Sequence, residues 1–149
     1  YTLRQMEAYL AAGQGLTSAI APSNAKNHVE HILPRHLSRS PSRMSDWSNF
    51  TDEARASHKN RLGNLALLEE DINKDVSNYD FSRKRDGHVT TRTRKKGYCD
   101  SSFSMVRPTP PGATPSVVKP LGDYADWTIA EIESRQQEMA QLALSVWSL

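Results

Sequence analysis

Residues 28–31 read HVEH and bring two imidazoles and one carboxylate within four positions. Side chains of these kinds bind metal ions or transfer protons near neutral pH. Zinc proteases place two histidines four residues apart on a helix, whereas His28 and His31 are three apart in a β-branched stretch that ends at Pro34. Zinc deaminases follow H-x-E with P-C-x-x-C, which a chain with Cys99 as its single cysteine cannot contain. Both zinc chemistries are therefore excluded.

Phosphodiester hydrolysis is a third chemistry that this stretch could perform. It needs a base that activates water and a hard divalent cation that stabilises charge on the phosphate. A histidine is a suitable base at neutral pH, and carboxylate and amide oxygens suit Mg²⁺ or Mn²⁺. The pair Glu30-His31 at the end of one strand, with asparagines in a second strand and in the helix after it, would meet these needs.

The elements that must position these residues can be predicted from hydrophobic periodicity. Residues 28–33 and the apolar run at 65–68 are typical of two short strands. A polar loop over 38–49 and a short helix over about 51–60 separate them, and acidic residues begin a further helix over 69–78. The resulting order of strand, loop, strand and helix predicts an α+β fold.

Helices are also predicted towards both ends of the chain. A capping-box pattern at Thr2 begins a helix over about residues 3–12, and residues 104–122, with five of the eight prolines, form a long connection. The stretch WTIAEI at 127–132 combines a capping box with a hydrophobic staple. One apolar face of the helix that follows is formed by Ile129, Ile132, Met139, Leu142, Ala143, Val146 and Trp147.

Length and composition indicate one domain, residues 1–149. The chain contains no apolar run of the ~18 residues that a membrane span requires. A start at Tyr1 without a signal peptide predicts a domain cut from a longer protein. A lone cysteine excludes an internal disulfide and suits a reducing cytoplasm.

Charge is unevenly distributed along the chain, although the net charge is only +2. Residues 83–96 carry seven Lys and Arg residues and one Asp, a local charge of +6, whereas residues 121–149 carry a local charge of −4. The basic segment suits a polyanionic substrate. It equally suits a solvated loop whose charge maintains solubility, and the sequence leaves both interpretations open.

Several short stretches together carry a resemblance to a known family: EHILP at 30–34, LGNLALL at 62–68, IN at 72–73, FSRK at 81–84, W-T-x-x-x-I-x-x-R at 127–135 and the late Trp147. In this order they resemble the HNH-type domain at the C-terminus of GmrSD-like modification-dependent restriction enzymes. They also resemble the nuclease domain of SspE-type anti-phage proteins, which act in phosphorothioate-based defence. The resemblance covers nearly the whole chain. It implies a ββα-metal (HNH-like) core flanked by N- and C-terminal helices.

The resemblance also implies a role for each matching residue. His31 is expected to be the general base, and Glu30 takes the position of an acidic metal ligand. Asn73 would complete a site for Mg²⁺ or Mn²⁺. Asn64, counted with the catalytic residues, would orient the histidine or its loop. His28 is expected to support the site.

Phosphate contacts are expected from five basic residues: Arg61, Lys74, Arg83, Lys84 and Arg85, with Lys84 the best match to the motif. His36 and His58 are expected to be surface or loop histidines. Such contacts give affinity but carry no sequence information.

The resemblance implies a DNA endonuclease or nickase in the bacterial cytoplasm. It further implies restriction or antiviral defence and, in the parent protein, other domains such as a nucleotide-hydrolysing sensor. An RNA substrate, double-strand cutting and pairing with a second copy stay open. The alternative is a non-catalytic nucleic-acid-binding or interaction module that keeps the fold.

Overall fold

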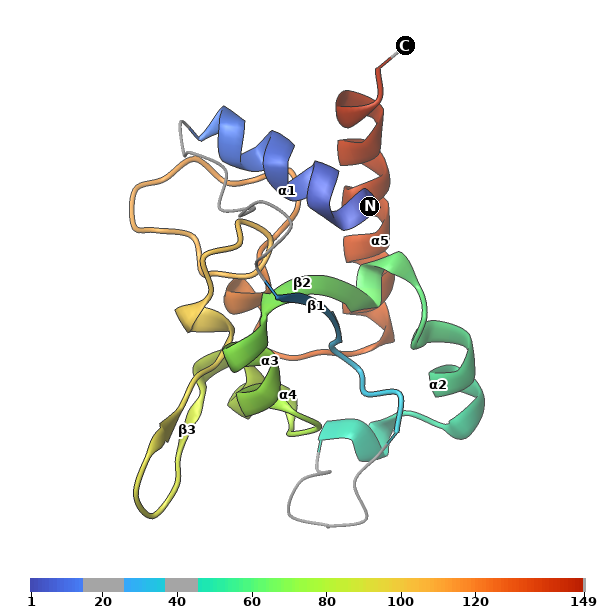
Figure 1. Cartoon of the computed structure of the whole chain (residues 1–149). Coiled ribbons are helices and arrows are strands. Elements are labelled where there is room, and N and C mark those ends of the chain that lie inside the picture. Colours follow the sequence, from blue (N-terminus) through green and yellow to red (C-terminus); the bar gives the residue numbers. More distant parts are fainter. Residues whose placement is uncertain (15–25, 37–45, 149) are drawn as a thin grey trace.

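The structure is a computed structural model that describes residues 1–14, 26–36 and 46–148. Within these residues the chain forms an α+β fold with five α-helices and two small antiparallel sheets (Figure 1). The predicted α+β class is therefore confirmed. Most of the polar loop predicted over 38–49 lies outside the described residues. None of the described helices is both long and apolar enough to cross a membrane.

The regular elements are, in chain order, α1 (Thr2–Gly13), β1 (Asn27–His31), α2 (Asp52–His58), β2 (Leu65–Glu69), α3 (Glu70–Val76), α4 (Phe81–Asp86), β3 (His88–Val89), β4 (Arg94–Lys95) and α5 (Ile129–Val146). Short 3-10 turns lie between them: η2 (Asp46–Asn49), η3 (Leu62–Asn64), η4 (Tyr98–Asp100) and η5 (Leu121–Asp123). The predicted succession of strand, short helix, strand and helix around the motif is present as β1, α2, β2 and α3.

Strands β1 and β2 form a two-stranded ribbon that carries the motif. Glu30 lies opposite Ala66, and His31 lies opposite Leu65. Because side chains alternate along a strand, Glu30 and His31 leave the ribbon on opposite faces. The face of His31 and Val29 borders a groove whose other wall is the start of α1. Lys84 of α4 contacts Glu30 on the other face, and α3 packs on both strands (Figure 1).

The two predicted capping boxes have different outcomes in the structure. At α5 the predicted capping box is confirmed, because Thr128 accepts a hydrogen bond from Ala130 N at 3.2 Å and Glu131 accepts one from Thr128 N at 2.9 Å. The capping box predicted at Thr2 is wrong: the helix begins one residue earlier, and Thr2 is its first residue, after an N-cap without a side-chain bond. Trp147 is also not part of the core face of α5, since it lies past the helix end and is 40% exposed.

The proline-rich region contributes to the core although it contains neither helix nor strand between η4 and η5. Phe103, Met105, Val106 and Val118 are all buried there. Two backbone bonds close this region, from Leu121 N to Met105 O at 3.1 Å and from Gly122 N to Val106 O at 2.9 Å. It therefore packs as irregular core and not only as a surface connection.

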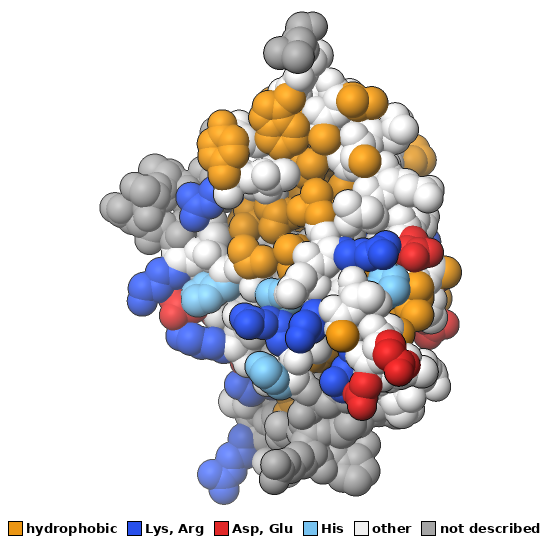
Figure 2. Space-filling model, turned by 90° about the vertical axis from the view of Figure 1, so that its right-hand side faces the viewer, with side chains coloured by type: hydrophobic (Ala, Val, Ile, Leu, Met, Phe, Trp, Pro, Cys, Tyr) orange, Lys and Arg blue, Asp and Glu red, His pale blue; other side chains and the backbone are white. Residues whose placement is uncertain are grey.

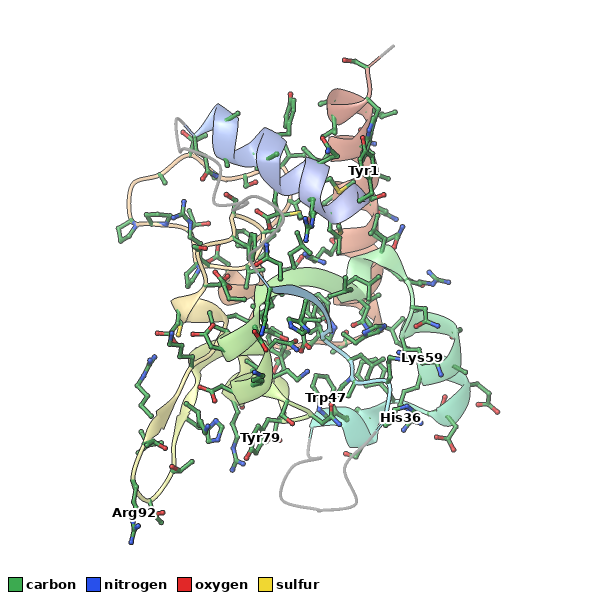
Figure 3. All side chains as sticks on the ribbon, viewed as in Figure 1. Tyr1, His36, Trp47, Lys59, Tyr79 and Arg92 are labelled. Atoms are coloured by element: carbon green, nitrogen blue, oxygen red, sulfur yellow. The ribbon has the colours of Figure 1, made fainter. Side chains whose placement is uncertain are left out.

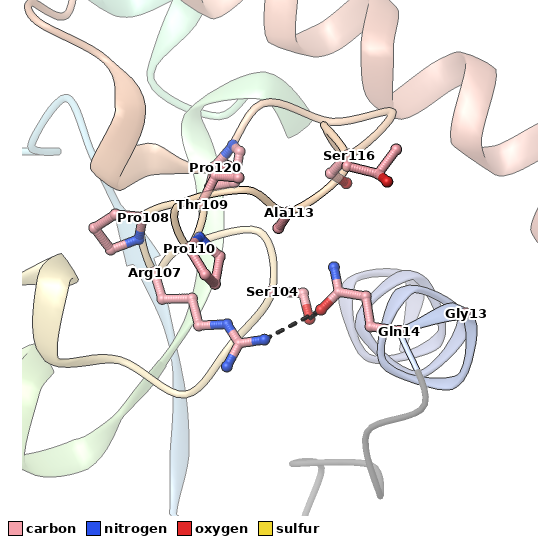
Figure 4. Close-up of a pocket in the computed structure, with 11 residues that line it drawn as sticks. Gly13, Gln14, Ser104, Arg107, Pro108, Thr109, Pro110, Ala113, Ser116 and Pro120 are labelled. Atoms are coloured by element: carbon pink, nitrogen blue, oxygen red, sulfur yellow. Dashed lines mark hydrogen bonds between the residues drawn. The ribbon is translucent and has the colours of Figure 1, made fainter.

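A hollow of about 360 Å³ lies between this region and the end of α1 (Figure 4). Arg107 crosses it and donates to the Gln14 side chain at 3.1 Å, while Ser104 Oγ donates to the same oxygen at 3.4 Å. These bonds tie the proline-rich region to α1.

Glu7 of α1 is a buried carboxylate that receives the backbone of the same region. Its two oxygens accept hydrogen bonds from Ser104 N at 2.7 Å and Met105 N at 3.0 Å. Burial raises the pKa of Glu7 to about 7, and the two backbone bonds only partly oppose this. Ionisation of Glu7 therefore lowers the free energy of unfolding at alkaline pH.

The pKa of Glu7 predicts a specific pH dependence of stability. A carboxyl whose pKa is raised by folding contributes stability that is fully present below its unfolded pKa, near 4.5, and is lost as pH rises through 7. Between pH 5 and pH 8 this loss amounts to about 2 kcal/mol. We expect Glu7→Gln to remove this part of the pH dependence, as measured by urea unfolding at several pH values.

The matched control is Glu53→Gln, which changes an exposed glutamate in the first turn of α2. It should leave the pH dependence as in the unmodified chain. Parallel curves for Glu7→Gln and the unmodified chain from pH 5 to pH 8 would contradict the assignment.

Candidate active site

A buried ion pair lies beneath the motif. Lys84 is fully buried, and its ammonium donates to Glu30 Oε1 at 2.6 Å and to the carbonyls of His31 and Ile32 at 3.2 and 3.1 Å. Tyr98 OH donates to the same Glu30 oxygen at 3.0 Å. The three donors of the ammonium thus have three acceptors. One side chain thereby holds both the carboxylate of the motif and the backbone that carries His31.

This position of Lys84 corrects the sequence prediction. A side chain with no exposed surface, whose donors are already used inside the protein, cannot contact a phosphate at the surface. In the fold Lys84 instead holds the Glu30 carboxylate and the His31 carbonyl. The residue type did not predict the burial of Lys84, because lysine is rarely buried unless it has a partner.

His31 lies at the end of β1 and is partly exposed. Burial lowers the pKa of its imidazole, hydrogen bonding with the Asn60 side chain opposes this, and the nearby charge of Arg35 lowers the pKa further. The imidazole is therefore neutral near pH 7, which is the form that can accept a proton. Asn60 was not predicted from the sequence, since it belongs to none of the motif stretches.

Asn64 is fully buried and joins the segment after His31 to the end of α2 and to Trp127. Its amide nitrogen donates to Leu33 O at 3.1 Å and to Lys59 O at 2.9 Å. Its oxygen accepts from Leu33 N at 2.8 Å and from Trp127 Nε1 at 3.1 Å. These four bonds make Asn64 a positioning residue that fixes the loop after β1.

Helix α5 binds the turn that carries Asn64, just before β2. Arg135 Nη1 donates to the carbonyls of Gly63 and Leu65, both at 2.9 Å, and Gln136 Oε1 accepts from Gly63 N at 2.7 Å. A Cβ at Gly63 would lie 2.2 Å from Ile132 O, so only glycine allows this approach. The sequence contained a signal for Arg135 that was missed: a charged residue within the apolar face of an amphipathic helix.

Two oxygen groups could contribute to a metal site. Both hydrogen bonds to Glu30 end on Oε1 and leave its Oε2 free of these two partners. Asn73, on α3, is partly buried, and its side chain makes no hydrogen bond to another described residue. No group of three or more His, Cys, Asp or Glu side chains among the described residues could hold a metal ion. A site with only a few protein ligands is nevertheless compatible with Mg²⁺, because this ion keeps several waters and binds one or two carboxylates together with substrate phosphates.

The other predicted phosphate contacts already have partners within the protein. Lys74 pairs with Glu70 at 2.7 Å, and Arg61 lies 3.5 Å from Glu133. Arg85 pairs with Asp86 at 2.7 Å and also donates to the carbonyls of Tyr124 and Ala125. The Arg83 guanidinium lies 5.6 Å from the centre of the Tyr79 ring. The structure does not bring these four side chains to His31 as one cluster.

The remaining histidines take different positions. His28 is exposed and lies on the Glu30 face of the ribbon, two residues before Glu30. His36 is exposed, as expected. His58, at the end of α2, is buried, contrary to expectation. Its Nδ1 lies 2.7 Å from Ala54 O, and its Nε2 lies 3.4 Å from Glu133 of α5.

The α+β domain thus carries a partly exposed histidine with a lowered pKa, next in sequence to a buried carboxylate. The model of a protein family described as GmrSD restriction endonucleases, C-terminal domain, matches residues 1–142. The chain therefore belongs to this family of restriction-enzyme nuclease domains, and the resemblance found in the sequence is confirmed. No curated protein and no solved structure matches the chain.

The buried ion pair predicts a large cost when one partner is removed. Lys84→Met leaves the carboxylate of Glu30 buried without its cation, which should lower the free energy of unfolding by about 3–5 kcal/mol. The double variant Glu30→Gln, Lys84→Met has no uncompensated charge and should recover most of this loss. Urea unfolding of the three proteins measures the difference.

Lys74→Met is the matched control, because it breaks an exposed lysine–glutamate pair. Such pairs contribute only about 0–1 kcal/mol. Equal losses for Lys84→Met and Lys74→Met would show that the pair does not hold the core.

Proposed function

We propose that this chain is the catalytic domain of a DNA endonuclease or nickase that acts in restriction or antiviral defence. The observation that carries the proposal is His31, a partly exposed imidazole whose pKa is lowered by burial, whose backbone is fixed by Lys84 and whose ring is held by Asn60. It occurs in a chain of a restriction-endonuclease family.

In this proposal His31 accepts the proton of the water that attacks the phosphorus. The imidazole is in the required form because burial keeps its pKa low. Asn64 and Lys84 act through His31: they fix the backbone from the His31 carbonyl to Leu33, so that the ring keeps its direction while the proton moves. Neither residue needs to touch the substrate.

Glu30, through Oε2, and Asn73, through its amide oxygen, would hold Mg²⁺ or Mn²⁺. When bound, such an ion neutralises charge on the phosphoryl oxygens. Lys84 and Tyr98 orient the carboxylate from its other oxygen, as outer partners of metal ligands commonly do. Glu30 and His31 leave opposite faces of the ribbon, but β1 ends at His31. The proposal requires a phosphate at this end of the ribbon to approach both side chains.

The same proposal assigns β1, β2 and α3 as the ββα-metal core. The pairing of the two strands and the packing of α3 on both support this assignment. His28, exposed on the Glu30 face, would support the site at its rim. One such site cuts one strand per encounter, so nicking is the expected product of a single copy.

His31→Ala should abolish metal-dependent nicking of supercoiled plasmid. Loss of a general base lowers the rate by about 10²–10⁴-fold, and the exposed control His36→Ala should retain the unmodified rate. Binding of DNA in EDTA should stay within about twofold for both variants, since neither removes a permanent positive charge. Full cleavage by His31→Ala would remove His31 from the mechanism. Binding without strand scission by the unmodified chain at any metal concentration would favour the non-catalytic module.

The pH dependence of nicking tests the state of the imidazole. Cleavage requires neutral His31, so its acid limb should fall below pH 6.5, the ordinary pKa of histidine. The bond from Asn60 raises this pKa, so Asn60→Ala should move the limb to lower pH, whereas Asn60→Asp adds a negative charge and should move it to higher pH. An acid limb above pH 6.5, or equal limbs in all three proteins, would contradict this role.

A further inference from the structure

The positive charge of the basic segment, residues 83–96, is largely neutralised within the protein. Five of its seven Lys and Arg residues form ion pairs with nitrogen–oxygen distances of 2.6–2.9 Å: Lys84 with Glu30, Arg85 with Asp86, Arg94 with Asp100, Lys95 with Asp75, and Lys96 with Asp71. The carboxylates come from several different elements. The local charge of +6 in the sequence is therefore not a free surface charge in the fold.

Two of these ion pairs hold the β3–β4 hairpin in place. Lys95 and Lys96 attach the β3–β4 hairpin to α3, and Asp75 also accepts a bond from Lys96 N at 3.0 Å. A hairpin of two-residue strands is too short to be stable alone. The basic segment thus braces the hairpin against α3.

Two other cations near His31 have no ion pair with any described residue. Arg35 is exposed, four residues after His31, and its charge lies close enough to lower the pKa of the imidazole. Lys59 is partly exposed and precedes Asn60, whose side chain holds the His31 ring. The Arg35 charge and the segment that carries Lys59 thus approach the proposed base from parts of the chain that are far apart in sequence.

Asn64 fixes the relative position of these two segments. Its amide binds the Lys59 carbonyl and both backbone groups of Leu33, two residues before Arg35. The backbone of Lys59 and the backbone two residues before Arg35 are thus both hydrogen-bonded to one buried side chain. Such preorganisation lowers the cost of ordering the side chains around a ligand.

Figures 2 and 3 show where the positively charged side chains lie on the molecule. Figure 2 shows Lys, Arg and His side chains in a band across the middle of one face, with most Asp and Glu towards one edge. Figure 3 places Lys59 on the side of α2 and Arg92 at the distant tip of the hairpin. The band lies on the side of the molecule that carries α2, away from the hairpin.

We infer that Arg35 and Lys59 bind backbone phosphates of the strand that His31 attacks, and that the basic segment does not form the main DNA contact. This inference rests on the proposed function, because it concerns the same site. Arg and Lys without internal partners release counterions from DNA when they bind, which is the main source of sequence-independent affinity. Paired cations must first give up their carboxylates.

The test is binding of a fluorescent DNA duplex in EDTA, followed by anisotropy at several salt concentrations. Arg35→Gln and Lys59→Gln should each weaken binding about 5- to 10-fold at 0.1 M salt and reduce the slope of log affinity against log salt by about 1. The double variant should show the sum of both slope changes. Lys59→Arg keeps the charge and should bind like the unmodified chain.

Lys74→Gln and Arg92→Gln are matched controls, because each removes one positive charge from an exposed side chain. Both should stay within twofold of the unmodified chain. Equal affinity of Arg35→Gln, Lys59→Gln and the controls would overturn the inference, as would a larger effect of Lys95→Gln. Plasmid nicking by the unmodified chain separates the two proposals: nicking with unchanged binding by the Arg35 and Lys59 variants overturns only this inference, whereas no nicking with any metal overturns the proposed function. Thermal melting checks that each variant is folded.

Discussion

The buried ion pair between Lys84 and Glu30 is the interaction on which the site depends. Removing two charges from water is costly, and their attraction repays this cost only when the remaining donors and acceptors are satisfied. Here the other two donors of the ammonium bind the carbonyls of His31 and Ile32. The requirement to satisfy a buried lysine therefore fixes the backbone of His31, the proposed base. Stability and the geometry of the site follow from the same set of hydrogen bonds.

A second constraint comes from the C-terminal part of the chain. Trp127 and Arg135 bind Asn64 and the carbonyls beside it, so the loop after β1 is held by residues more than sixty positions away. Gly63 allows the close contact with α5 that these bonds need. Helix α5 is thus part of the support of the site, although none of its residues carries the proposed chemistry. A site on a two-stranded ribbon requires such support, because an isolated hairpin is only marginally stable.

The sequence predicted the elements better than the contacts between them. Periodicity and the cap at Thr128 predicted β1, β2 and α5, because these signals are local. The candidate residues Glu30, His31 and Asn64 came from short stretches that resemble a family, and their roles in the reaction stay predictions. The burial of Lys84 and His58 was not predictable, because it depends on carbonyls and carboxylates supplied by other elements. The local charge of residues 83–96 was misleading for the same reason: a charge sum along the chain omits the acids that fold against it.

The ion pair also bears on how a cation would bind. Lys84 lies 2.6 Å from one oxygen of Glu30 and compensates its negative charge. A divalent cation held as proposed would gain less from this carboxylate than from an unpaired one, and Asn73 would add only a neutral oxygen. Most of the negative charge around such an ion would then come from the phosphate of the substrate. In the proposed mechanism, cation and DNA bind together, and a domain without DNA would hold the ion weakly. This coupling would confine hydrolytic activity to the moment when a phosphate lies at the end of β1.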